Sequence, residues 1–123
     1  MDTDRNDETT TIFELRETVR VFVAERRWEK YHRPKNLAAS ISVEAGELLE
    51  LFQWLTPEEA EAAKTHGELR DQVTDELADV LAYLLALANV LDLDVAGALL
   101  EKFKKNRRKY PPDEFQGTWS RPG

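Results

Sequence analysis

The sequence predicts an all-α fold, and three observations carry this prediction. Apolar residues recur every three or four positions along most of the chain, which is the spacing of one helix face. No stretch alternates between apolar and polar residues as a half-buried strand does, and glycine is scarce, with 5 among 123 residues. At two expected helix starts, a threonine stands three residues before a glutamate. The chain has the length of one domain.

The first helix is expected from Thr11, which has a capping-box spacing to Glu14, to about Lys30. Its apolar stripe consists of Ile12, Leu15, Val19, Phe22 and Val23. Residues 1–10 show no apolar periodicity, and we therefore expect them to form a disordered tail.

The second helix is expected over residues 36–55, after a connection at 31–35 that contains a proline. Its stripe consists of Leu37, Ile41, Leu48, Leu51, Phe52 and Leu55. A short polar segment over residues 56–67 follows. It opens with a second capping box, formed by Thr56 and Glu59, and has proline at its first helical position.

The longest helix is expected from 68 to 91 and the last one from 95 to about 109, with an aspartate-rich break between them. The stripe of the longest helix consists of Leu69, Val73, Leu77, Val80, Leu84, Leu87 and Leu91. Residues 111–123 hold three of the 5 prolines, and we expect an extended tail there. The folded domain is thus predicted over residues 11–110.

Composition excludes several classes of protein. There are no cysteines, which rules out a disulfide scaffold, a thiolate zinc site and a cysteine nucleophile. The net charge of −7 argues against a surface that binds nucleic acid. No apolar run approaches the ~18 residues of a membrane span, and the first eleven residues are polar. We therefore expect a cytoplasmic protein that does not contact membranes.

Two pairs of acids lie where leucines are expected. Counted at 100° per residue from the first leucine of each stripe, Glu44 and Glu76 both fall at about 340°, inside the stripe. Glu47 and Asp79 both fall at about 280°, on its flank. A lone pair of acids with this spacing is usually solvated helix surface. Two pairs in the same phase predict a functional cluster.

Acids on an apolar stripe need a partner. Two carboxylates ~6 Å apart repel by roughly 3 kcal/mol at an effective dielectric constant near 20. Hard divalent cations take oxygen ligands, and Mg²⁺ in particular combines carboxylates with waters and substrate phosphates. If the two helices face each other, the four acids surround one cavity. The pattern therefore predicts a Mg²⁺ site, which Mn²⁺ could also fill.

Other residues are candidates for binding a substrate. Lys102 and Asn106 share the inward stripe of the last helix, where a cation could hold a phosphate and an amide could bridge phosphate or sugar. Tyr83 lies one turn beyond the second acidic pair, and a core tyrosine is an equal interpretation. Trp28 and Trp54 end their helices, where an indole ring either walls a pocket or plugs a core or interface.

Taken together, these segments resemble the all-α nucleoside triphosphate pyrophosphatases of the MazG-like group, and within it the dCTP pyrophosphatase branch. The likeness covers about residues 12–112. It is carried by AERRWE at 24–29, RPKNL at 33–37, EAGEL at 44–48, ELFQW at 50–54, ELADVLAYL at 76–84 and KFKKNRRKYP at 102–111. The resemblance implies a four-helix MazG-like bundle that is completed by oligomerisation, as a homodimer or homotetramer.

The resemblance also implies roles for single residues. The metal ligands would be Glu44, Glu47, Glu76 and Asp79, and these acids with Lys102 would be catalytic. The substrate-binding residues would be Trp28, Asn36, Trp54, Tyr83, Lys102 and Asn106. In dCTP-specific relatives a histidine is expected in the base pocket on the first helix, where this chain has Val19. Strict cytosine specificity is therefore not implied.

The function expected from the sequence is Mg²⁺-dependent hydrolysis of a nucleoside triphosphate between its α- and β-phosphates. The products are a monophosphate and pyrophosphate, and dCTP or a modified dCTP is the expected substrate. The alternative is a helical module that dimerises through its apolar stripes and performs no chemistry. That alternative leaves the acids inside the stripes without a role, unless basic residues pair with them across the interface.

Overall fold

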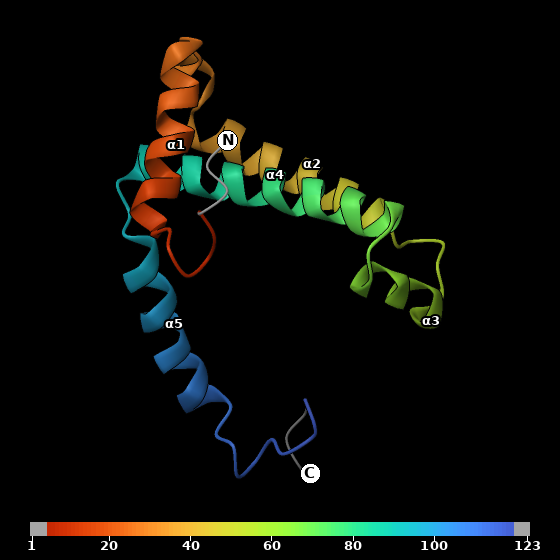
Figure 1. The fold of residues 1–123 in the computed structure, drawn as a ribbon. Coiled ribbons are helices and arrows are strands. Elements are labelled where there is room, and N and C mark those ends of the chain that lie inside the picture. Colours follow the sequence, from red (N-terminus) through yellow and green to blue (C-terminus); the bar gives the residue numbers. More distant parts are fainter. Residues whose placement is uncertain (1–4, 120–123) are drawn as a thin grey trace. The chain divides into compact units, whose positions relative to one another are not determined.

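The computed structural model describes residues 5–119, and all regular structure within that range is helical, which confirms the all-α prediction (Figure 1). The elements in order are α1 (Ile12–Glu25), η1 (Glu29–Tyr31), α2 (Pro34–Glu50), α3 (Pro57–Ala60), η2 (Glu61–Lys64), α4 (Glu68–Leu91) and α5 (Val95–Lys109). The chain forms two compact units, residues 1–92 and residues 93–123. Parts of both predicted tails, residues 1–4 and 120–123, lie outside the described range.

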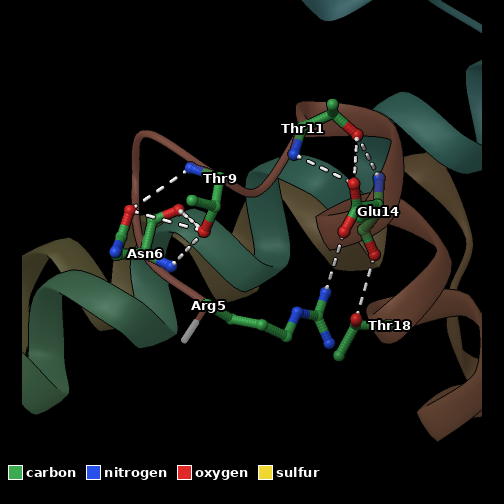
Figure 2. A network of polar contacts seen from close by, with 6 residues as sticks. All are labelled: Arg5, Asn6, Thr9, Thr11, Glu14 and Thr18. Carbon is green, nitrogen blue, oxygen red and sulfur yellow. Dashed lines mark hydrogen bonds and ion pairs between the residues drawn. The ribbon is translucent and has the colours of Figure 1, made fainter. Parts of the chain in front are cut away.

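The predicted capping box starts α1. Glu14 donates its main-chain N–H to Thr11 Oγ1 at 3.1 Å, and Thr11 donates its N–H to Glu14 Oε1 at 3.5 Å. Figure 2 shows this pair with the turn before it, where Asn6 Oδ1 accepts from the N–H of Thr9 at 3.2 Å and Arg5 pairs with Glu14 at 3.4 Å. These contacts connect the residues just before α1 to its first turn.

The first helix ends at Glu25, five residues before the predicted end, because the chain turns left-handed at Arg27, where φ is 54°. The N–H of Trp28 bonds the carbonyl of Val23, and that of Arg27 bonds the carbonyl of Ala24, both at 3.0 Å. This pair of bonds is a Schellman motif. Such ends are normally marked by glycine, and an arginine gave no signal of the end. The end places Trp28 after the helix rather than in it.

The second helix spans Pro34–Glu50, so it starts two residues before the predicted start and ends five before the predicted end. Proline at its first position suits a helix start, because the missing N–H has no partner there anyway. Beyond Glu50 the N–H groups of Phe52 and Leu55 bond carbonyls three residues back, at 2.9 Å each. These turns contain about 3.0 residues each instead of the roughly 3.6 of an α-helix, so the side chains beyond Glu50 point in other directions than a continued helix would give them. Trp54 consequently points outward and is 87% exposed.

The remaining elements agree with the sequence prediction. Thr56 and Glu59 form a capping box at α3. The helices α4 and α5 have the predicted bounds, and Asp94 caps α5 by accepting the N–H of Gly97 at 2.8 Å. Taken alone, no helix in the described range is long and apolar enough to span a membrane. The consecutive pair α4 and α5 would meet that test of length and composition only if counted together.

Within the first unit, α2 runs alongside α4, and α1 packs against the C-terminal half of α4 (Figure 1). The buried core is small and consists of Val23, Leu37, Leu85, Ala86 and Ala88. Large apolar side chains on all three helices stay exposed, among them Phe13 at 70%, Leu49 at 62% and Leu77 at 56%. A single copy of the chain therefore leaves much of its apolar surface uncovered.

Candidate metal centre and adjoining cavity

The pairing of α2 with α4 brings the predicted acids together. Glu44, Glu47 and Glu76 each present a carboxylate oxygen, and these atoms all lie within 4.8 Å of one another. Glu44 and Glu76 are half-buried and Glu47 is exposed, which is the burial expected from their positions on the two stripes. The charge of Asp79, one turn along α4, acts on both Glu44 and Glu76. All four acids thus interact in one cluster.

The cluster raises the pKa of its central members. Burial is the largest cause of the raised pKa of Glu44, which reaches about 7. Hydrogen bonding to Glu47 and the negative charges of Glu47, Asp79 and Glu76 add to it. The pKa of Glu76 is also raised, first by burial and then by the charge of Glu47. Without a cation, these carboxyl groups tend to keep protons that ordinary glutamates lose.

Two oxygens of the cluster are enclosed and unsatisfied. Glu44 Oε2 and Glu76 Oε2 are buried and have no hydrogen-bond partner among the described residues. An ionised carboxylate only accepts, so such an atom needs a donor or a cation. Carboxylate oxygens are the ligands that hard divalent cations prefer. The oxygens of Glu44, Glu47 and Glu76 therefore fit one divalent metal ion, and Asp79 adds its negative charge to the cluster.

A cavity of about 320 Å³ adjoins the cluster. It lies between α1, the connection after it and α4. Its lining residues are Thr18, Val19, Phe22, Val23, Trp28, His32, Asp79, Ala82, Tyr83 and Ala86. Asp79 belongs to both the cavity and the acidic cluster. Aromatic rings form part of its walls. The rings of Phe22 and Trp28 meet edge to face with their centroids 5.9 Å apart, and the ring centroids of His32 and Tyr83 are 6.5 Å apart. A flat apolar ligand group suits these walls, and an anionic end would suit the acidic side only across a bound cation.

The structure brings only some of the predicted substrate residues to this cavity. Trp28 and Tyr83 line it. Trp54 does not, and Asn36 is exposed and donates to the carbonyl of Tyr31 at 3.3 Å. The two predicted residues of α5, Lys102 and Asn106, belong to the second compact unit.

Three polar or aromatic residues of the lining were not predicted as site residues from the sequence. His32 lies in a connection between helices, which no periodicity reaches; its spacing of three residues from Glu29 is only a weak metal signal and does not indicate a cavity. Phe22 was assigned to the core stripe of the first helix, yet it is 48% exposed and faces the cavity. Thr18 is an ordinary polar helix residue with no distinguishing pattern.

Comparison with known proteins gives consistent results. Residues 39–121 match the model of the MazG-like family. The chain is 42% identical over 108 residues to dCTP pyrophosphatase 1 of Bos taurus, covering 88% of this chain and 64% of the relative. It is 43% identical over 101 residues to the Homo sapiens protein of the same name, covering 82% of this chain and 59% of the relative. The chain thus spans less than two thirds of these relatives.

A solved structure superposes on this chain over almost the whole length of the solved chain. A pyrophosphatase from Archaeoglobus fulgidus superposes with a TM-score of 0.75 at 43% sequence identity, covering 87% of this chain and 98% of that one. The likeness therefore covers both the fold and most of the sequence of this chain. With the family model matching from Ala39 onward, it shows that this chain belongs to the MazG-like family.

Proposed function

We propose that this protein is a Mg²⁺-dependent nucleoside triphosphate pyrophosphohydrolase that acts on dCTP or a modified dCTP. The observation that carries the proposal is the pair of enclosed carboxylate oxygens, Glu44 Oε2 and Glu76 Oε2, in a cluster that shares Asp79 with an aromatic cavity. The names of the curated relatives support dCTP as the substrate.

The cavity would hold the nucleoside. Trp28 and Phe22 offer ring faces and edges, and stacking a base on an aromatic ring is worth roughly 1–3 kcal/mol. His32 and Tyr83 add polar ends to otherwise apolar walls. Stacking tolerates every base, so shape and these polar groups would have to supply the selectivity.

The triphosphate would extend from the cavity to the acids. Glu44, Glu47, Glu76 and Asp79 would hold the metal; bound there, it offsets phosphate charge and makes a water more acidic. Asp79 is common to the cavity and the cluster, so the α-phosphate would lie near it. A carboxylate of the cluster accepts the proton of the attacking water. The water oxygen would bond to the α-phosphorus while the bond from that phosphorus to the oxygen shared with the β-phosphate breaks, and pyrophosphate would leave with that oxygen.

We further infer that the site is completed by a second copy of the chain. The exposed apolar residues of α1, α2 and α4 need cover, and a homodimer or homotetramer provides it. Lys102 and Asn106 of α5, with Asn36 and Trp54, are proposed to reach the triphosphate or the nucleoside in that assembly. Lys102 would stabilise charge on the leaving pyrophosphate. A cytoplasmic location stays a prediction.

An interaction module without chemistry explains the exposed apolar faces equally well. It does not explain the acids, because an assembly role favours removing half-buried charges rather than clustering them. The enclosed oxygens therefore favour the enzyme.

The test is a nucleotide panel with pyrophosphate and monophosphate detection. With Mg²⁺ present, wild-type protein is expected to release both products from dCTP, and Glu76→Gln is expected to lose at least about 100-fold in kcat. Glu50→Gln serves as the matched control, because Glu50 is an exposed acid on α2 outside the cluster. Absence of pyrophosphate with every nucleotide would contradict the function, and activity in Glu76→Gln equal to that of the control would contradict the site.

A further inference from the structure

A reciprocal set of hydrogen bonds joins α1 to the last turns of α4. Arg16 donates from Nε to Asn89 Oδ1 at 2.9 Å and from Nη2 to the carbonyl oxygen of Ala88 at 3.2 Å. Asn89 donates in turn from Nδ2 to the carbonyl oxygen of Arg16 at 3.1 Å. These bonds are partly buried and join residues that are 72 or 73 positions apart. Each side chain therefore holds the main chain of the other helix.

The position suits a charged donor. Asp92, which ends α4, donates its N–H to the same main-chain carbonyl of Ala88 and to that of Asn89. The last carbonyls of a helix carry partial negative charge, which the guanidinium of Arg16 offsets. Hydrogen bonds from a charged donor are stronger than neutral ones, and they are directional. The contact thus defines both the rotation and the axial position of α1 against α4.

The same helix faces form the cavity walls. Arg16, Val19 and Val23 follow one another at spacings of three and four residues on α1, and Asn89 follows Ala86 by three on α4. Val19, Val23 and Ala86 line the cavity beside the acids, and they also line a second cavity of about 320 Å³ that Asn89 borders. Val19, Val23 and Ala86 are small and apolar, and the contacts that such residues make are non-directional. These apolar contacts therefore do not determine how α1 is rotated against α4.

We propose that Arg16 and Asn89 are positioning residues that hold the α1 wall of the nucleotide cavity in place against α4. This inference rests on the proposed function. Neither residue lines the cavity beside the acids. The pair acts through the placement of Val19 and Phe22, and therefore on nucleotide affinity and base selectivity rather than on phosphate hydrolysis.

The kinetic test uses the purified full-length protein and its dCTP activity. Arg16→Met is expected to raise KM about tenfold, to change kcat less than about twofold and to narrow the preference for dCTP over dTTP. Arg16→Lys is expected to recover part of the affinity, because one ammonium can still reach one of the two acceptors. The double variant with Asn89→Leu and Arg16→Met should have a KM only a little higher than that of either single variant, because both substitutions remove the same contact.

Arg70→Met is the matched control. Arg70 also donates to two main-chain carbonyls, those of Ala63 at 3.1 Å and Lys64 at 3.4 Å, but it lies outside the cavity. The KM of Arg70→Met is expected to match that of wild type even if the melting temperature of this variant falls. An equal rise in KM for Arg70→Met, or a loss confined to kcat in Arg16→Met, overturns the proposal.

A second readout does not need turnover. With Trp54 and Trp119 replaced by phenylalanine, Trp28 in the cavity wall is the one remaining indole of the chain. Arg16→Met and Asn89→Leu in that background are expected to increase acrylamide quenching of Trp28, and Arg70→Met is not. Unchanged quenching in both variants overturns the positioning role. If no nucleotide is hydrolysed, the proposed function fails, and the quenching result still decides whether the pair shapes the cavity.

Discussion

At the scale of single residues, the acidic cluster conflicts with folding in the absence of a cation. Glu44 and Glu76 are partly removed from water and face two further acids. The raised pKa values express this conflict, because the folded chain disfavours the ionised groups more than the unfolded chain does. Metal binding and protonation are two ways to relieve it.

The pH dependence of stability follows from these shifts. Glu44 ionises near pH 4.5 when unfolded and near 7 when folded, so its destabilising effect is absent below about 4.5, grows as pH rises and is complete above about 7. The raised pKa of Glu76 acts in the same direction. Metal-free protein is therefore expected to have a lower melting temperature at pH 8 than at pH 5, measured in a chelator.

The variants separate this effect from other titrations. The glutamine in Glu44→Gln cannot ionise. This variant is therefore expected to show a weaker dependence of the melting temperature on pH, and to have a higher melting temperature than wild type at pH 8. Glu50→Gln, outside the cluster, should keep the wild-type slope. Equal slopes in Glu44→Gln and wild type would refute the electrostatic account. Added Mg²⁺ should raise the melting temperature of wild type more at pH 8 than at pH 5, because the ligands bind as carboxylates.

At the scale of elements, two helices end at residues other than glycine in the left-handed region. Arg27 has a φ of 54° after α1, and Asp92 has a φ of 53° after α4. The left-handed conformation costs a residue with a Cβ about 1–2 kcal/mol, and glycine does not incur this cost. The end of α1 matters for the site, since it directs Trp28 into the cavity.

Arg27→Gly is expected to stabilise the fold by about 0.5–1 kcal/mol, because relief of the left-handed conformation exceeds the extra entropy of glycine in the unfolded chain. The measurement is the midpoint of urea unfolding. Arg27→Val should act in the opposite direction, because a β-branched residue tolerates positive φ least. A destabilised glycine variant would show that the Arg27 side chain supports the turn itself.

At the scale of the whole molecule, one copy exposes more apolar surface than a stable monomer normally does. Among the described residues the buried core has five members, whereas leucines and phenylalanines of α1, α2 and α4 stay in contact with solvent. Folding and association are therefore expected to be linked.

Light scattering at micromolar concentration is expected to give the mass of a dimer or a larger oligomer. The melting temperature should fall on dilution, because a partner that binds only the folded chain stabilises it by an amount that grows with the logarithm of the partner's concentration. A monomer whose melting temperature does not depend on concentration would contradict the proposed assembly.

Much of the fold could be read from periodicity and caps. The bounds of α4 and α5 and the capping boxes at Thr11 and Thr56 agree with the prediction, because these signals are local. The ends of α1 and α2 did not agree. They depend on turns without glycine or proline, whose stabilising contacts, such as that between Phe22 and Trp28, form only in the folded chain.

By itself, the sequence determined the helical class and the phases that bring Glu44, Glu47, Glu76 and Asp79 onto two facing stripes, because a helix converts spacing into direction. Only the tertiary structure decided that Oε2 of Glu44 and Glu76 are enclosed. It alone also decided that His32 and Trp28 line one cavity, and that Arg16 meets Asn89. These are distances between separate elements. They depend on how helices pack, and no periodicity along one helix contains that information.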